Sequence, residues 1–310
     1  MSSVQPIPPE QAASKGIATG LLLAFLGSIA FSGKSIIVKL AYRHGVDAVT
    51  LIMYRMLFAL PIFVVMAWWA GRGRPPLTRS DWLGVFGLGV TGYYLASALD
   101  FAGLAYISAS LERLILYLNP TLVVGLGWLL YGRTIRWGQV AGMLLSYCGV
   151  VLVFGRELGS QGNDAAWGAL LVFLSTVAYA VYLVYSGELV RRLGALRLVG
   201  LATSVACLCC LAQFAVLRPL GAAQVVPEVI WLSILNATLC TATPVVLVMM
   251  AIERIGAGMA AQTGMVGPLS TIAMGVWILD EPFTLWVAAG TALVLAGIFL
   301  FTRMVRRSGA

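Results

Sequence analysis

Two long stretches of the chain repeat each other without a gap, 148 positions apart. Residues 106–153 contain an apolar run, a short polar break and a second apolar run, and residues 254–301 repeat this order. Internal repeats limit the possible architectures more strongly than any local pattern, so the chain is expected to be a tandem duplication. Three aligned pairs illustrate the match: Pro120 with Pro268, Gly142 with Gly290, and Gly149 with Gly297.

The composition requires lipid as the main solvent. Apolar residues make up 60% of the 310 residues and charged residues only 10%, whereas soluble domains carry roughly 25% charged residues. A membrane-spanning helix needs about 20 mostly apolar residues, and ten such stretches fit the chain. The runs lack the alternating pattern of barrel strands. The expected fold is therefore an all-α integral membrane protein with ten transmembrane helices and short loops.

The ten spans fall into two halves of five. Residues 1–15 are polar and are expected to form a disordered cytoplasmic N-terminus without a convincing cleavable signal. The first repeat covers 16–156, the second covers 157–305, and 306–310 form a cytoplasmic tail. The expected spans are 16–41, 48–70, 82–103, 107–130, 136–155, 165–187, 195–217, 228–250, 257–279 and 284–303.

The distribution of Lys and Arg predicts the orientation. If the N-terminus is cytoplasmic, thirteen of the twenty lie in cytoplasmic segments, four lie outside, and three lie within spans. This bias follows the positive-inside rule and places both termini in the cytoplasm. Because each half has an odd number of spans, the second half must be inverted relative to the first. Inverted repeats are typical of secondary transporters, whose substrate site lies between the halves near the midplane of the bilayer.

Other partners are disfavoured by the sequence. The net charge of +8 is explained by topology signals rather than by nucleic-acid binding. Five cysteines fall inside apolar runs without metal-ligand spacing, so they are expected to be buried free thiols, and no metal or cofactor is expected. The chain has no GxxxxGK[ST] loop for direct use of ATP. The cysteines are Cys148, Cys207, Cys209, Cys210 and Cys240.

The whole chain after residue 15 resembles the EamA-type branch of the drug/metabolite transporter superfamily. The resemblance rests on the ten-span duplication, the prolines of the fourth and ninth spans, Arg55 within 54–61, the segment 108–120, and Asp280-Glu281-Pro282. It implies export of amino acids or other metabolites, with some members being importers. Family members often carry an acidic residue at the end of the fourth span, where this chain has Gly132-Arg133.

Five charged residues lie within spans, all in the outer half of the first repeat: Lys34, Arg55, Asp100, Glu112 and Arg113. Charges inside a bilayer are expensive and mark functional sites. One interpretation is a structural cluster in which the charges pair and hold helices together. The other is that one base is left over, since three bases face two acids, and binds a substrate carboxylate. Arg55 is the preferred anchor because guanidinium binds carboxylate through two hydrogen bonds, and Glu112 is a candidate proton carrier.

Further candidates come from the helix breaks and the aromatic residues. Pro120 and Pro268 are expected to kink equivalent spans near their middle and to act as hinges, or to serve only packing. Glu112 and Asn119 share one face of the fourth span, and the tyrosines are expected to line a pocket or simply to pack. The candidate substrate-binding residues are Arg55, Glu112, Asn119, Lys34, Arg113, Tyr94, Tyr179, Tyr182, Asn236 and Gln262.

The sequence therefore predicts a secondary-active transporter of the bacterial inner membrane that exports a small polar metabolite, such as an amino acid, by alternating access. A coupling proton or an exchanged metabolite is an expected second partner. Uptake and broad drug export stay open. A membrane-embedded enzyme is disfavoured by the single histidine, and a channel is a further alternative. The Gly-x6-Gly pairs favour close packing within the chain, while monomer and homodimer both stay open.

Overall fold

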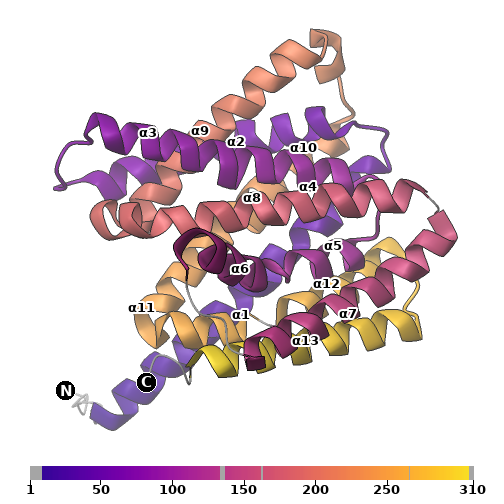
Figure 1. Ribbon diagram of the computed structural model, residues 1–310. Coiled ribbons are helices and arrows are strands. Elements are labelled where there is room, and N and C mark those ends of the chain that lie inside the picture. The colour runs from indigo at the N-terminus through magenta and orange to yellow at the C-terminus, as the bar shows by residue number, and fades with distance from the viewer. Residues whose placement is uncertain (1–8, 133–136, 162, 265, 307–310) are drawn as a thin grey trace, which may run out of the picture.

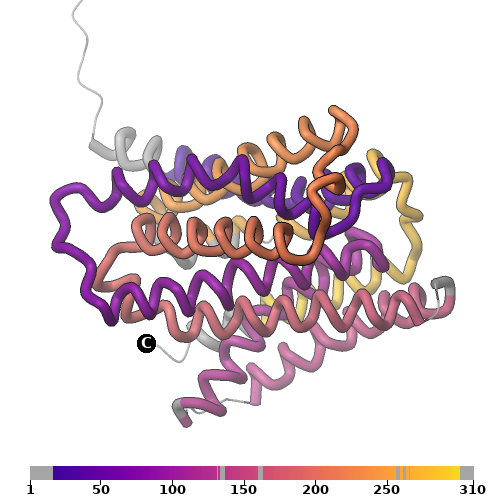
Figure 2. The backbone as a smooth tube through the Cα atoms, turned by 90° about the horizontal axis from the view of Figure 1, so that it is seen from above, coloured from indigo at the N-terminus to yellow at the C-terminus, as the bar shows by residue number. Residues whose placement is uncertain are grey.

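The computed structural model describes residues 9–132, 137–161, 163–264 and 266–306; the side chains of some further residues, Gln262 among them, lie outside the description. Every regular element in these ranges is a helix, and most of the long helices lie side by side along roughly the same axis, with successive helices running in opposite directions (Figures 1 and 2). The first half contains α1 (Pro9–Tyr42), α2 (Ala48–Gly71), α3 (Arg79–Leu88), η1 (Gly89–Leu95), α4 (Ala96–Leu104), α5 (Ala109–Leu116), α6 (Asn119–Tyr131) and α7 (Trp137–Gln161). The second half contains α8 (Asn163–Leu193), α9 (Ala195–Leu217), η2 (Leu220–Ala223), α10 (Pro227–Ala237), η3 (Thr238–Ala242), α11 (Thr243–Thr263), α12 (Val266–Leu279) and α13 (Leu285–Arg306).

The ten expected spans are present in this arrangement. Eight helical segments of the described chain are long and apolar enough to cross a membrane, and the shorter apolar helices α12 and α13 complete the set. Large apolar side chains cover the outside: Trp277 is 83% exposed, and Leu129 is 70% exposed. Such exposure would be unfavourable in water and is expected for a surface that faces lipid. The chain is an all-α integral membrane protein.

Two boundaries differ from the expectation. α1 begins at Pro9, so residues 9–15, expected to be disordered, form its first turns. Proline is tolerated at the first position of a helix. The eighth and ninth spans, expected to separate near residues 251–256, run together in α11, which ends at Thr263. Glu253 and Arg254 are both exposed, so this charged pair does not have to interrupt the helix.

The fourth and ninth spans are interrupted at equivalent places. Between α5 and α6 the helix stops at Tyr117 and Leu118, and Pro120 occupies the first turn of α6. The second interruption separates α11, which ends at Thr263, from α12, which begins at Val266, and Pro268 follows in α12. These two ends lie 147 positions after Leu116 and Asn119, within one residue of the repeat spacing. The prolines therefore mark two separate helices rather than a bend within one, because a proline is tolerated in the first turn but not in the interior. Figure 2 shows α6 leading away from the body of the bundle.

A second feature repeats with the same spacing. The third span contains a π-helical segment, η1 (Gly89–Leu95), and the eighth contains η3 (Thr238–Ala242). Adding 148 to the bounds of η1 gives 237–243, which encloses η3. Single π-helical turns are rare and frequently lie at functional sites. Because two of them occur at equivalent positions, both repeats are best explained as copies of one five-helix unit that already contained this turn.

Glycines at the crossing of α7 and α13 show that the repeats are inverted. A Cβ on Gly149 would lie 2.5 Å from the carbonyl oxygen of Gly290, and one on Gly297 would lie 2.6 Å from that of Gly142. Gly149 of the first repeat therefore contacts Gly290 of the second, and their equivalents, Gly297 and Gly142, contact each other in the same way. Two equivalent helices make this reciprocal contact only when they run antiparallel about a twofold axis. The Gly-x6-Gly pairs therefore pack within the chain, as the sequence predicts.

Gly149→Ala is expected to destabilise the protein, because its methyl group has no room against the α13 backbone. Close-packed interiors respond to the addition of a single carbon with strain of about 1–3 kcal/mol. Gly155→Ala is the matched control on the same helix, since its added Cβ would meet nothing within 4 Å. Thermal unfolding in detergent measures both. An unfolding temperature of Gly149→Ala equal to that of Gly155→Ala would contradict this packing.

Candidate functional site

Three of the five membrane charges form one ion-paired cluster. The Lys34 ammonium on α1 lies 2.5 Å from Asp100 Oδ2 on α4 and 3.1 Å from Glu112 Oε1 on α5. The Ser35 hydroxyl donates to Glu112 Oε2 at 2.8 Å, and Glu112 is fully buried. The cluster joins three spans of the first repeat. Because two carboxylates share one ammonium, these three residues together carry a net charge of −1 when all are ionised.

Arg113, next to Glu112, is held by hydroxyl groups instead of carboxylates. Its Nε donates to Thr271 Oγ1 at 2.9 Å, and its Nη2 donates to Ser32 Oγ at 2.8 Å. Thr271 belongs to α12 and Ser32 to α1, so this guanidinium connects the ninth span to the first. Arg113 therefore contacts both repeats.

Arg55 lies on α2 with part of its hydrogen-bonding capacity unused. It is 7% exposed, its Nε donates to Thr241 Oγ1 at 3.1 Å, and its guanidinium carbon is 5.1 Å from the centre of the Phe101 ring. Among the described residues, its Nη1 has no hydrogen-bond partner. A buried donor without a partner is unfavourable and is usually satisfied by another group. Arg55 is therefore a cation available for a further ligand.

The surroundings of Arg55 include unpaired acceptors. Within the described structure, Asn236 Oδ1 and Asp100 Oδ1 are buried without a hydrogen-bond partner. Asp100 directly precedes Phe101, the residue on which Arg55 stacks. The Thr241 hydroxyl accepts from Arg55 and donates to the Asn236 carbonyl oxygen at 2.8 Å. This hydrogen bond spans five positions, and Thr241 lies within the π-helical turn η3. An unused donor and two unused acceptors thus belong to neighbouring residues of both repeats.

The two helix interruptions meet each other next to these charges. The Gly264 carbonyl oxygen, at the second interruption, accepts from Tyr117, at the first, over 2.7 Å, and from Ser28 over 2.8 Å. Ser32 donates to the Gly267 carbonyl oxygen at 2.9 Å. These hydroxyl groups therefore add hydrogen bonds to backbone carbonyls beside the second interruption and connect them to the first interruption and to α1. Because equivalent positions contact one another, this region lies close to the twofold axis between the repeats.

Comparison with known proteins gives the family. The EamA-like transporter family matches the chain twice, over residues 18–155 and 166–303. The chain belongs to the EamA-like transporter family. A relative from Bacillus subtilis, the uncharacterized transporter YcbK, is 30% identical over 88% of this chain and 89% of its own length. An uncharacterized transporter from Archaeoglobus fulgidus is 26% identical over 92% and 97% of the two chains.

A solved protein structure shares the fold at low sequence similarity. It matches this EamA-like chain with a TM-score of 0.61 at 19% identity, and covers 94% of this chain and 99% of its own. The family and the names of the relatives indicate a membrane transporter.

The other predicted site residues of this EamA-like chain lie in a separate group or outside the description. Tyr182 on α8 stacks on Tyr179 with ring centres 5.5 Å apart, and its hydroxyl lies 3.3 Å from that of Tyr93 on η1. Tyr94 packs at the edge of the apolar core formed with α2 and α9. Asn119 Nδ2 donates to the Thr176 carbonyl oxygen at 3.3 Å and so joins α6 to α8. The side chain of Gln262 lies outside the described residues.

The hydroxyl groups around the arginines were mostly missed in the sequence. Ser28, Ser32 and Ser35 recur at helical spacing in α1, and this periodicity marks one polar face of an apolar helix. Thr271 carries no such local signal, because its role depends on Arg113 of the other repeat. The cysteines also differ in part from the expectation: Cys207, Cys210 and Cys240 are buried, whereas Cys148 is exposed on α7.

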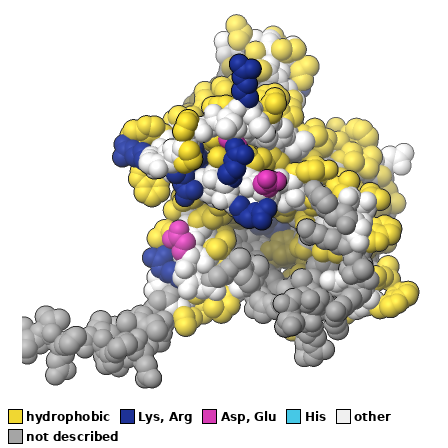
Figure 3. Space-filling model, turned by 60° about the vertical axis from the view of Figure 1, so that its left-hand side comes forward, with side chains coloured by type: hydrophobic (Ala, Val, Ile, Leu, Met, Phe, Trp, Pro, Cys, Tyr) yellow, Lys and Arg dark blue, Asp and Glu magenta, His cyan; other side chains and the backbone are white. Residues whose placement is uncertain are grey.

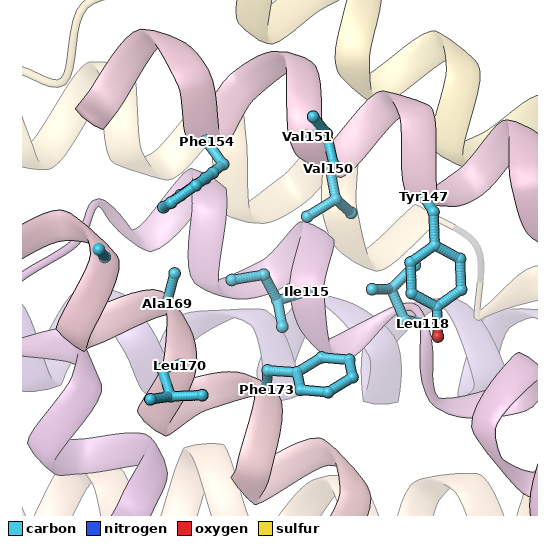
Figure 4. Close-up of a pocket in the computed structure, with 10 residues that line it drawn as sticks. Ile115, Leu118, Tyr147, Val150, Val151, Phe154, Ala169, Leu170 and Phe173 are labelled. Atoms are coloured by element: carbon cyan, nitrogen blue, oxygen red, sulfur yellow. The ribbon is translucent and has the colours of Figure 1, made fainter. Parts of the chain in front are cut away.

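A groove on the side of the bundle has a different chemistry. Apolar and aromatic side chains from α5, α7 and α8 line it, and its volume is about 240 Å³ (Figure 4). Ile115, Val150 and Phe173 point into it, and Tyr147 closes one end. Because these helices face lipid and the lining offers almost no polar atoms, the groove suits an acyl chain rather than a polar solute.

Proposed function

We propose that the chain is a secondary-active transporter that exports a small metabolite carrying a carboxylate, such as an amino acid, by alternating access between its inverted repeats. The observation that carries this proposal is the buried Arg55 Nη1, which has no partner among the described residues. A guanidinium with a free N–H edge is suited to bind a carboxylate. Thr241 and Asn236 of the second repeat then add hydrogen bonds to the same substrate.

The charge balance supports an anionic group in the bound substrate. Asp100 and Glu112 form ion pairs with Lys34, whereas no ion pair joins either carboxylate to Arg55 among the described residues. Summed over the five membrane charges, three bases and two acids leave +1. A carboxylate bound at Arg55 removes this excess charge, and buried charges are most stable when they are paired.

The proposed orientation places both termini in the cytoplasm and the protein in the plasma membrane. Lysine and arginine side chains gather on the face shown in Figure 3, and the positive-inside rule assigns such a face to the cytoplasm. α1 begins and α13 ends at this same end of the bundle (Figure 1). Exposed arginines of the segments at this end are Arg72, Arg74, Arg79, Arg191, Arg192 and Arg254.

Direction and substrate are tested together in growing cells. Cells that overproduce the protein are challenged with toxic analogues of carboxylated metabolites. Export predicts that they tolerate at least one analogue better than cells producing Arg55→Gln at the same level. Greater sensitivity of the overproducing cells would establish uptake instead. Equal tolerance of all carboxylated analogues, with resistance to uncharged drugs, would favour a broad drug exporter.

Glu112 is the proposed proton carrier of the cycle. It shares the Lys34 ammonium with Asp100 and lies fully buried. When Lys34 moves away, binding of a proton to Glu112 neutralises the carboxylate that has lost its cation. Glu112→Gln is therefore expected to flatten the pH dependence of transport, measured as initial flux between about pH 5 and pH 8. Glu228→Gln, at an exposed acidic residue of α10, serves as the control. A Glu112→Gln variant that keeps the pH profile of the wild type would exclude this role.

A further inference from the structure

At one end of the bundle a carboxylate of the second repeat binds the start of a helix of the first repeat. Glu281, in the loop between α12 and α13, accepts through Oε1 from the Ala109 amide at 2.7 Å. Through Oε2 it accepts from the Ser110 hydroxyl at 2.8 Å and from the Ser110 amide at 3.3 Å. A carboxylate is stabilised at a helix N-terminus by the free N–H groups and by the helix dipole. This contact joins the outer half of the fourth span to the outer end of the ninth.

The local structure around Glu281 is built for this contact. Asp280 is the one non-glycine residue with a positive φ, 60°, in the part of the chain that the structure describes. This left-handed residue turns the chain back, so that the Glu281 amide donates to the Gly275 carbonyl oxygen at 3.0 Å. A Cβ at Gly275 would lie 2.9 Å from Glu281 Oε2. The strained turn and the absent side chain both favour the observed position of the carboxylate.

Two further contacts strengthen this end of the bundle. Arg43, just beyond α1, donates through Nη2 to the Leu279 carbonyl oxygen at 2.7 Å and again joins the two repeats. The Ser108 amide donates to Glu157 Oε2 of α7 at 3.1 Å, within the first repeat. The start of α5 is therefore held by one carboxylate from its own repeat and by one from the other.

The opposite end of the bundle has no equivalent acceptor in the sequence. The position that corresponds to Glu281 in the first repeat is Arg133, a cation that cannot accept an N–H hydrogen bond. The position that corresponds to Ala109 is 257, which lies inside the continuous helix α11. Its backbone N–H is used within that helix rather than being free, as at a helix start. The two ends of the pseudo-symmetric bundle thus differ in a specific interaction.

We propose that Glu281 is a latch that holds the outer end of the transporter closed, so that the resting protein faces the cytoplasm. Outward opening then requires the Glu281 carboxylate to leave the start of α5. This inference rests on the proposed alternating access, and it names the residue that favours the inward-facing state over the outward-facing state. A twofold-symmetric transporter would populate both states equally, and an interaction present in only one state shifts the populations by its own free energy.

The test is a distance measurement on the purified full-length protein, by double electron–electron resonance between spin labels. Cys148 and Cys209 are first replaced by alanine, and the three buried cysteines remain. One label pair, at Tyr106 and Leu285, spans the latch, and both positions are exposed. A second pair, at Leu129 and Arg254, reports on the opposite end. Glu281→Ala is expected to add a longer distance at the outer pair and a shorter one at the inner pair.

Matched variants make the outcome decisive. Glu228→Ala removes an exposed carboxylate near the same end of the protein without a contact between repeats, and should keep the wild-type distances. Glu281→Gln retains an acceptor oxygen and most of the shape of the side chain, so the population with the longer outer distance should be smaller than in Glu281→Ala. If Glu281→Ala does not fold, Glu281→Gln is measured in its place. Wild-type distances in a monodisperse Glu281→Ala or Glu281→Gln would overturn the latch. Because no substrate is needed, this result is independent of whether carboxylated metabolites are transported.

Discussion

Arg55→Gln is expected to reduce transport of carboxylated substrates at least about 30-fold while the protein still inserts and folds. Removing one partner of a buried charge pair costs about 2–5 kcal/mol, and each 1.4 kcal/mol is a factor of about ten. Glutamine retains a donor near Thr241 but cannot supply the charge or the paired N–H edge. Initial flux into proteoliposomes, at equal amounts of monodisperse protein, measures the loss.

Two comparisons separate substrate binding from structural damage. Arg218→Gln removes an arginine from a surface ion pair with Asp47, whose atoms lie 3.1 Å apart, and should leave transport unchanged. An amide analogue of the substrate, which lacks the carboxylate, should move equally slowly through the wild type and Arg55→Gln. If Arg55→Gln transports the carboxylated substrate at the wild-type rate, Arg55 is not the anchor.

Lys34→Met is expected to destabilise the folded protein by roughly 3 to 5 kcal/mol, because it leaves Asp100 and Glu112 buried together without their cation. Thermal unfolding in detergent and the monodisperse yield report this loss. Lys39→Met is the control on the same helix, since Lys39 forms no ion pair among the described residues. An unfolding temperature of Lys34→Met equal to that of Lys39→Met would show that the cluster does not stabilise the fold.

A compensated variant sharpens this prediction. Combining Lys34→Met with Asp100→Asn and Glu112→Gln removes all three charges at once. Replacing a complete buried ion cluster by neutral groups is much less damaging than removing one partner. The triple variant is therefore expected to unfold at a higher temperature than Lys34→Met alone. A triple variant less stable than Lys34→Met would mean that shape rather than charge pairing dominates at this cluster.

The architecture was largely predictable because membrane folding leaves few choices. Each apolar run must become a helix, since lipid offers no hydrogen bonds to the backbone. The equivalence of Gly142 and Gly149 with Gly290 and Gly297 predicted close packing of two repeats, and the structure joins these glycines reciprocally. The exact ends were not predictable: the charged pair Glu253-Arg254 favoured a break at 251–256, but both side chains are exposed and the helix continues to Thr263.

The candidate site was predictable only in part. The five charges stand out because ionised groups are rare within spans, but their partners depend on how distant helices meet. Thr241 accepts from Arg55, and Thr271 accepts from Arg113, 186 and 158 positions away along the chain. The sequence assigns no structural role to Glu281, because its counterpart Arg133 departs from the acidic residue that family members often carry. The structure explains this difference between the repeats, because Glu281 accepts hydrogen bonds from the start of α5 and an arginine could not.

Counterflow in proteoliposomes tests the central claim most directly. Purified wild-type protein is reconstituted into liposomes loaded with an unlabelled amino acid or another carboxylated metabolite, and uptake of the labelled compound is followed. The account predicts transient accumulation that depends on the internal compound and is lost with Arg55→Gln. Accumulation that persists in Arg55→Gln, or an absence of flux for every carboxylated metabolite alongside rapid movement of uncharged compounds, would contradict it.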